Sequence, residues 1–64
     1  MEYTYTVTFH GDYFSLTTHI TVDPKPMDDP ETLAIDLAAN MLQNMYGWDV
    51  KAVSHEIDVY REEM

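Results

Sequence analysis

Cysteine is absent from this chain of 64 residues, and glycine occurs only twice, as Gly11 and Gly47. A domain shorter than roughly 70 to 80 residues usually needs disulfides, a metal, very regular packing or oligomerisation to stay folded, and here the first of these routes is closed. The two glycines are too far apart to form a phosphate-binding loop. These absences exclude a disulfide-stabilised protein and give more weight to self-association as a source of stability.

A hydrophobic run long enough to span a membrane is also missing. The chain begins Met1-Glu2-Tyr3 with alternating polarity, whereas a secretion signal begins with a basic segment followed by an apolar one. Lack of cysteine fits a reducing compartment. We therefore expect a soluble cytoplasmic protein, folded as a single domain over residues 1–64, with no membrane partner.

Basic residues are few: Lys25, Lys51 and Arg61 stand against twelve acidic residues, and the formal net charge is -9. Nucleic acids and anionic lipids are bound chiefly by Lys and Arg, so direct binding of either is not expected. Acidic residues promote solubility, and they can also attract a basic partner such as a nucleic-acid-binding protein. The expected partner is a protein or a second copy of the chain, in a homodimer.

Among the residues that are present, threonine alternates with aromatic or apolar residues from Tyr3 to His10, the pattern of a β-strand with two different faces. Gly11-Asp12 is a typical two-residue hairpin turn and is followed by a second alternating run. Counting outward from this turn predicts apolar pairs on one face and polar pairs on the other: Phe9 with Phe14, Val7 with Leu16, Tyr5 with Thr18, Tyr3 with Ile20; Thr8 with Ser15, Thr6 with Thr17, Thr4 with His19.

After this hairpin, three prolines and three aspartates between residues 23 and 30 predict a loop. A helix should follow, with Asp29 as N-cap, Pro30 as its first residue and Gly47 as its left-handed C-terminal cap. Apolar residues at helical spacing predict the face that packs on the hairpin: Leu33, Ala34, Leu37, Ala38, Met41, Leu42 and Met45.

The segment from Trp48 to Tyr60 is rich in β-forming residues, but the parity of its apolar positions changes, so we predict a strand with a bulge near Ala52. The expected fold is α+β in the order β-β-α-β, a three-stranded antiparallel sheet in the order 2-1-3 with one helix packed on one face. A sheet in the order 1-2-3, with its last pair parallel, is the alternative.

A single helix covers only one face of such a sheet. The residues expected on the other face are either a solvated β-surface or a partner-binding surface: Thr4, Thr6, Thr8, Ser15, Thr17, His19, Glu56 and Asp58, with Ser54 and Thr21 beside them. Tyr13 and Tyr60 are the aromatic residues expected to be most exposed, and tyrosine is enriched in the parts of interfaces that contribute most to binding.

The histidines do not predict a metal site. In the hairpin register His10 and His19 lie roughly 20 Å apart, and His55 is expected at the margin of the core without a second ligand. Asp23, Asp28, Asp29 and Glu31 lack the spacing of a calcium loop and are better explained by turns and capping. We therefore expect no metal and no cofactor.

Catalytic residues are not predicted either. Ser54 and His55 are neighbours in the expected strand, so their side chains would point to opposite faces and could not form a nucleophile–base pair. Glu56 and Asp58 share a face, but an open sheet offers no walled cleft to shift the pKa of a carboxyl group. We expect no enzyme activity.

In element order and charge, the chain resembles small acidic proteins encoded by bacteriophages, including some phage inhibitors of uracil-DNA glycosylase that act as DNA mimics. The resemblance covers the whole chain at the level of element order; the tetrapeptide Ser54–Ile57 is too short to be a shared motif. It implies location in the host cytoplasm and a role in binding a host protein.

Two functions follow. One is a non-enzymatic protein-binding module, an inhibitor or modulator of a host protein that uses the threonine-rich sheet face. The alternative is a DNA mimic that occupies a basic nucleic-acid-binding site through Asp23, Asp28, Asp29 and Glu31, together with Glu56 and Asp58. A mimic would present a row of carboxylates, but the expected outer face of the helix offers Asp36 among Thr32, Asn40 and Gln43.

Overall fold

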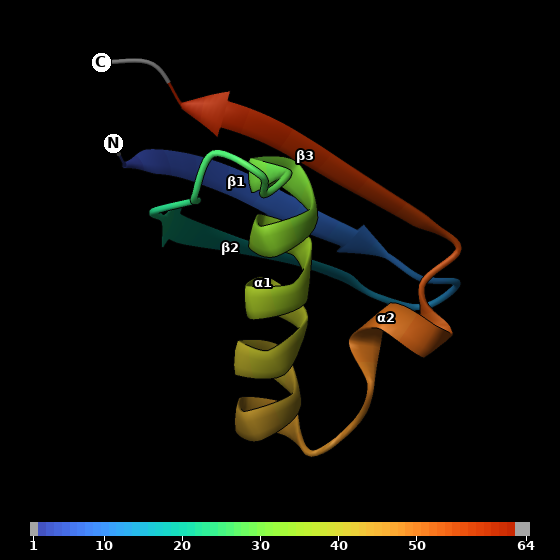
Figure 1. The fold of residues 1–64 in the computed structure, drawn as a ribbon. Helices are drawn as coiled ribbons and strands as arrows, with labels where there is room; N and C mark the ends of the chain where they lie inside the picture. The colour runs from blue at the N-terminus through green and yellow to red at the C-terminus, as the bar shows by residue number, and fades with distance from the viewer. Residues whose placement is uncertain (1, 63–64) are drawn as a thin grey trace.

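The computed structural model describes residues 2–62 and has the predicted order β-β-α-β, with one additional short helix (Figure 1). Its elements are β1 (Tyr3–His10), β2 (Ser15–Val22), α1 (Pro30–Tyr46), α2 (Val50–Val53) and β3 (Glu56–Glu62). The strands form a three-stranded sheet in the order β2-β1-β3, and β1 is antiparallel to both neighbours. This confirms the α+β fold and the strand order 2-1-3, and it excludes the order 1-2-3.

The hairpin register differs from the prediction. Phe9 lies opposite Leu16, where the two-residue turn predicted Phe14, and His10 lies opposite Ser15. The chain reverses through Gly11–Phe14, and the amide of Gly11 donates to the carbonyl of Phe14 at 2.9 Å. Phe14 leaves the strand because its ring packs edge-on against Trp48, with the ring centroids 5.0 Å apart. The shift is an even number of residues, so the side chains of β1 and β2 keep their predicted faces.

The boundaries of α1 agree with the prediction. Asp29 has an extended backbone and its carboxylate accepts a hydrogen bond from the amide of Glu31, while Pro30 opens the helix. At the other end Gly47 has a φ of 78°, in the left-handed region that glycine tolerates best, and its amide donates to the carbonyl of Gln43 at 2.7 Å. Within residues 2–62 the structure contains no helix long and apolar enough to cross a membrane.

The core lies between α1 and the face of the sheet that carries Tyr5, Val7 and Phe9. Its buried hydrophobic residues are Tyr5, Val7, Phe9, Val22, Ala34, Ala38, Ala39, Leu42 and Val50. For two residues of the predicted apolar helix face the prediction is wrong: Leu37 is exposed, and Met45 is 64% exposed. Figure 1 shows the last turns of α1 extending beyond the sheet, so the end of this apolar face has no strand to pack on.

The predicted bulge near Ala52 is wrong, because the chain forms α2 there. The carboxylate of Asp49 caps this turn by accepting from the amides of Lys51 and Ala52, and Val50 is fully buried. Ser54 therefore caps α2 and does not extend the sheet. A side-chain ion pair of 2.9 Å between Lys51 and Asp36 joins α2 to α1.

Candidate functional site

The sheet has one face that α1 does not cover, and we call it the open face. Because side chains alternate along a strand, the register assigns to this face every second residue of each strand. The open face consists of Thr4, Thr6, Thr8, His10, Ser15, Thr17, His19, Thr21, Glu56, Asp58, Tyr60 and Glu62. None of these residues is buried.

Side-chain hydrogen bonds join β1 to β2 across the open face. They connect Thr4 with Thr21 at 3.0 Å, Thr6 with His19 at 3.2 Å and Thr8 with Thr17 at 3.1 Å. These are the partners that the corrected register places opposite one another, and they replace the predicted pairs of Thr4 with His19 and Thr6 with Thr17. Each hydroxyl has a partner within the monomer and can make a further hydrogen bond to a molecule bound on this face.

The carboxylates of the open face lie on β3, at one border. His10 Nε2 lies 2.8 Å from Asp58 Oδ2, and His19 Nδ1 lies 3.4 Å from Glu62 Oε1. Tyr60 is 68% exposed on the same strand, opposite Thr6. The hairpin part of the face is therefore polar and uncharged apart from its histidines, while acidic groups and one exposed tyrosine follow the β3 border.

All eight residues predicted for the partner-binding surface lie on the open face, so the structure brings them together. The prediction omitted His10, Tyr60 and Glu62 from this surface. Their parity could have included them, since His10 alternates in phase with the threonines of β1 and Tyr60 in phase with Asp58. The expected exposure of Tyr13 and Tyr60 is confirmed.

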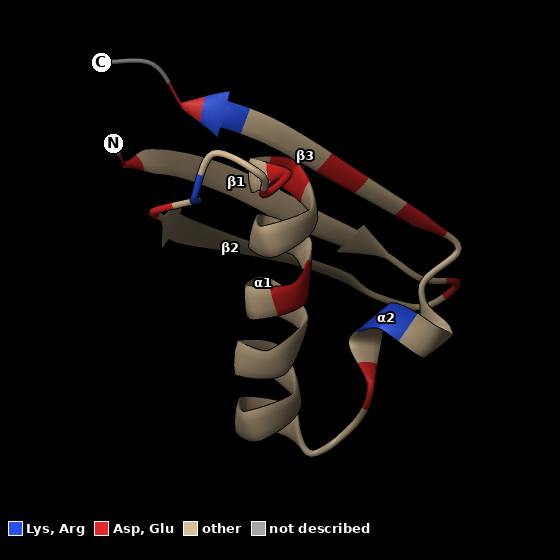
Figure 2. Ribbon diagram, in the orientation of Figure 1, with Lys and Arg blue, Asp and Glu red and all other residues tan. Residues whose placement is uncertain are grey.

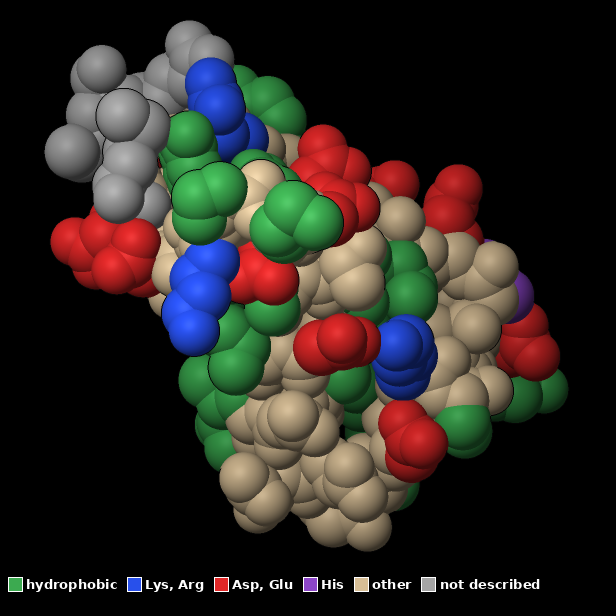
Figure 3. All heavy atoms as spheres, in the orientation of Figure 1, with side chains coloured by type: hydrophobic (Ala, Val, Ile, Leu, Met, Phe, Trp, Pro, Cys, Tyr) green, Lys and Arg blue, Asp and Glu red, His purple; other side chains and the backbone are tan. Residues whose placement is uncertain are grey.

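Of the acidic residues of the alternative function, Glu56 and Asp58 lie on the open face, and the other four lie elsewhere. Glu31 is in the first turn of α1. Asp23 follows β2, and Asp28 and Asp29 occupy the loop before α1, where both carboxylates accept backbone hydrogen bonds. Figure 2 shows this group near the start of α1 and the acidic residues of β3 on a separate strand. In the space-filling view of Figure 3, carboxylates on the visible face form separate groups, some beside basic side chains and others between uncharged ones.

Ser54 and His55 do not form a nucleophile–base pair. The Ser54 hydroxyl donates to the carbonyl of Val50 as part of the α2 cap, and His55 Nε2 lies 3.9 Å from Asp12 Oδ1. The prediction that His55 lies at the core margin is wrong, because the turn between α2 and β3 leaves this residue exposed. Its backbone amide donates to the carbonyl of His10 at 2.9 Å.

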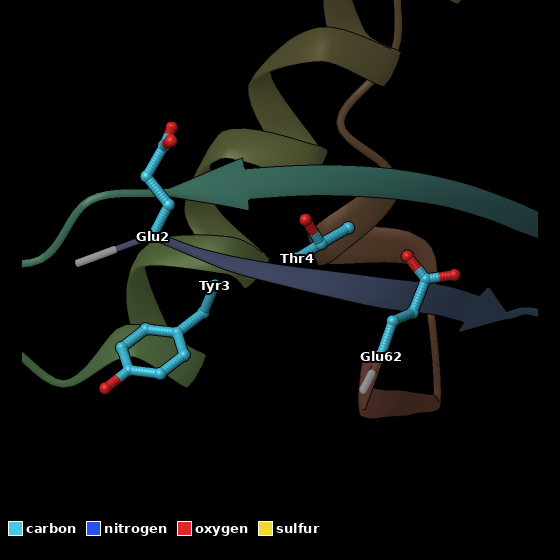
Figure 4. A pocket seen from close by; sticks show the side chains of 4 residues that line it. All are labelled: Glu2, Tyr3, Thr4 and Glu62. Atoms are coloured by element: carbon cyan, nitrogen blue, oxygen red, sulfur yellow. The ribbon is translucent and has the colours of Figure 1, made fainter. Parts of the chain in front are cut away.

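An open pocket of about 300 Å³ lies where β1 begins and β3 ends, lined by Glu2, Tyr3, Thr4 and Glu62. Figure 4 shows that these side chains spread in different directions, with Tyr3 turned away from Glu2 and Thr4. The carboxylates of Glu2 and Glu62 would repel an anion, and the four side chains do not converge on one point. The pocket therefore does not define a substrate site.

These features define the class of the molecule, a small acidic α+β domain whose sheet has one face covered by a helix and one open face. Comparisons with models of protein families, with characterised proteins and with solved structures found no match to this chain. The functional argument therefore rests on the chemistry of the open face.

Proposed function

We propose that the protein is a non-enzymatic, cytoplasmic protein-binding module and that the open face is its contact surface. The single observation that carries this proposal is an uncovered sheet face on which the residues of β1 and β2 include no carboxylate, in a protein with a net charge of -9. The centre of an interface is depleted of charged residues, and its rim is polar and solvent-accessible. Threonine hydroxyls on β1 and β2 would supply hydrogen bonds directly or through water.

The first occupant to test is a second copy of the chain. The core of this small domain contains three alanines and few large side chains, so burial of a further surface would add stability that the monomer lacks. A two-fold symmetric dimer places the same surface of both copies in contact. Face-to-face packing of two open faces would bury the threonine rows of both hairpins.

Charge favours one of the two symmetric arrangements. In face-to-face packing the two-fold axis lies in the plane between the two sheets. If this axis is perpendicular to the strands, β3 of one copy lies over β3 of the other, and their carboxylates oppose each other. An axis parallel to β1 would instead place β3 over β2 of the second copy, and Tyr60 would face His19, since both residues lie beside Thr6. We propose the second arrangement, because it avoids this repulsion.

Arginine substitutions at Thr6 and Thr8 test this proposal. Both residues lie on the central strand β1, which would face β1 of the second copy, so the arginines should leave the fold intact and repel one another across the interface. The matched control replaces Asn40 and Gln43, which are exposed on α1, with arginine and makes the same change in charge. In sedimentation at millimolar concentration, we expect a dimer for the wild type and the control and a monomer for the open-face variant.

A wild type that remains monomeric at this concentration would contradict the homodimer. The open face would then be tested by capture of partners from a cell lysate on immobilised wild type, open-face variant and control. Equal retention of the same proteins by all three would contradict the open face as a contact surface. Binding that persists in the open-face variant and weakens steeply with salt would support the alternative of nucleic-acid mimicry.

A further inference from the structure

One histidine and two carboxylates meet at the corner of the open face where β1 ends and β3 begins. His10 is the last residue of β1 and lies opposite Glu56, the first residue of β3, and Asp58 follows on the same face. One nitrogen or oxygen atom from each of these side chains lies within 4.8 Å of the other two. The group joins residues that are distant in the sequence, so spacing along the chain does not predict it.

The backbone that carries these three side chains is fixed by packing on the opposite, covered face of the sheet. Phe9 precedes His10 on β1 and lies opposite Ile57, which stands between Glu56 and Asp58 on β3. Phe9 is fully buried, and Ile57 packs against the core. The carbonyl of His10 also accepts the hydrogen bond from His55 at the turn into β3. Ligands carried on rigid strands lose little conformational freedom when they bind an ion.

We propose that His10, Glu56 and Asp58 form a binding site for a divalent transition-metal ion of the zinc type. One imidazole nitrogen and two carboxylate oxygens suit Zn²⁺, whereas Ca²⁺ and Mg²⁺ are bound by oxygen ligands. The Nε2 lone pair of the neutral imidazole, with its proton on Nδ1, would bind the ion between His10 and Asp58. Zn²⁺ bonds of this type place tetrahedral ligand atoms about 3.4 Å apart, which rotation of these solvent-accessible side chains can reach.

Charge and access both favour a cation at this corner. The side chains of His10 and Asp58 are 32% and 65% exposed, so an ion can enter and a water molecule can complete its coordination. Of the basic residues, Lys51 pairs with Asp36, and Arg61 lies over the Tyr3 ring on the covered face. Neither of these two contacts neutralises Glu56 or Asp58. All three side chains come from one monomer. The proposed dimer would cover them, so Zn²⁺ is titrated at a protein concentration at which the chain is monomeric.

Calorimetric titration of untagged, metal-stripped protein with Zn²⁺ tests the site. We expect one Zn²⁺ per chain, and we expect His10→Ala and Asp58→Asn each to weaken binding by about tenfold or more. The matched control is His19→Ala, which removes the other histidine that lies beside a carboxylate on the same face. This control should bind Zn²⁺ as the wild type does, and an excess of Mg²⁺ should not displace the ion.

Imidazole nitrogen NMR spectra of the wild type give a readout that does not depend on the folding of any variant. Zn²⁺ should shift the Nε2 resonance of His10 and leave those of His19 and His55 in place. Absence of stoichiometric binding would overturn the proposal, as would equal shifts of all three histidines. Equal weakening by His10→Ala and His19→Ala would also overturn it, because binding would then reflect general attraction to an acidic surface.

Discussion

Replacement of Asp29 with alanine should lower the free energy of unfolding by about 1 kcal/mol. The Asp29 carboxylate accepts hydrogen bonds from the Glu31 amide at 3.2 Å and from the Thr32 hydroxyl at 2.9 Å. Alanine offers no acceptor, so a backbone donor in the first turn of α1 loses its partner within the protein. The negative charge that interacts favourably with the helix dipole is lost as well.

This effect is large for so short a chain. At about 0.05 to 0.15 kcal/mol per residue, a domain of this size is stable by roughly 3 to 10 kcal/mol. A loss of about 1 kcal/mol should therefore lower the melting temperature by about 4 to 8 °C. Removing one carboxylate from a chain of net charge -9 also reduces self-repulsion, which acts in the opposite direction.

Thermal unfolding followed by far-ultraviolet circular dichroism separates these contributions. Asp29→Asn makes the same change in charge as Asp29→Ala but keeps an oxygen that can accept the Glu31 hydrogen bond, so it should be the more stable of the two. Asp28→Ala is the positional control, because the Asp28 carboxylate accepts from the Lys25 amide in the preceding loop. Equal melting temperatures for Asp29→Ala and Asp29→Asn, or a larger loss in Asp28→Ala, would refute the assignment of Asp29 as the cap.

Two further predictions concern the hairpin turn and the independence of the fold from metal. Gly11→Ala should destabilise by about 1 to 3 kcal/mol, because its Cβ would lie 1.9 Å from the Phe14 ring and force that ring from Trp48. Urea denaturation measures the unfolding midpoint of Gly11→Ala, and Tyr13→Ala is the control at a fully exposed position. Equal midpoints for the two variants would contradict the packing argument. Metal-stripped protein should retain its helix signal and unfold cooperatively, since the buried core is almost entirely apolar; a large loss of helix signal on adding chelator, with zinc found by elemental analysis, would contradict this.

Several features of the fold could be predicted from the sequence because they depend on neighbouring residues. Alternation between Tyr3 and His10 determines which side chains share a face, and a register shift of an even number of residues leaves that assignment unchanged. The boundaries of α1 follow from Asp29 and Gly47, because capping involves only the adjacent turn of the helix. Alternation also explains why the six residues predicted for the open face on β1 and β2 lie together, whereas Glu56 and Asp58 join them only because β3 pairs with β1.

Other features depend on contacts between distant parts of the chain, and only the tertiary structure decided them. Packing of Phe14 on Trp48 lengthens the hairpin turn, although Gly11-Asp12 alone favours a shorter one. Met45 is exposed because α1 extends beyond the sheet, and the periodicity of apolar residues in a helix does not predict where the sheet ends. His10 meets Glu56 and Asp58 only because β3 pairs with β1 in one register. Local patterns thus determined which faces exist, and long-range packing decided which side chains meet on them.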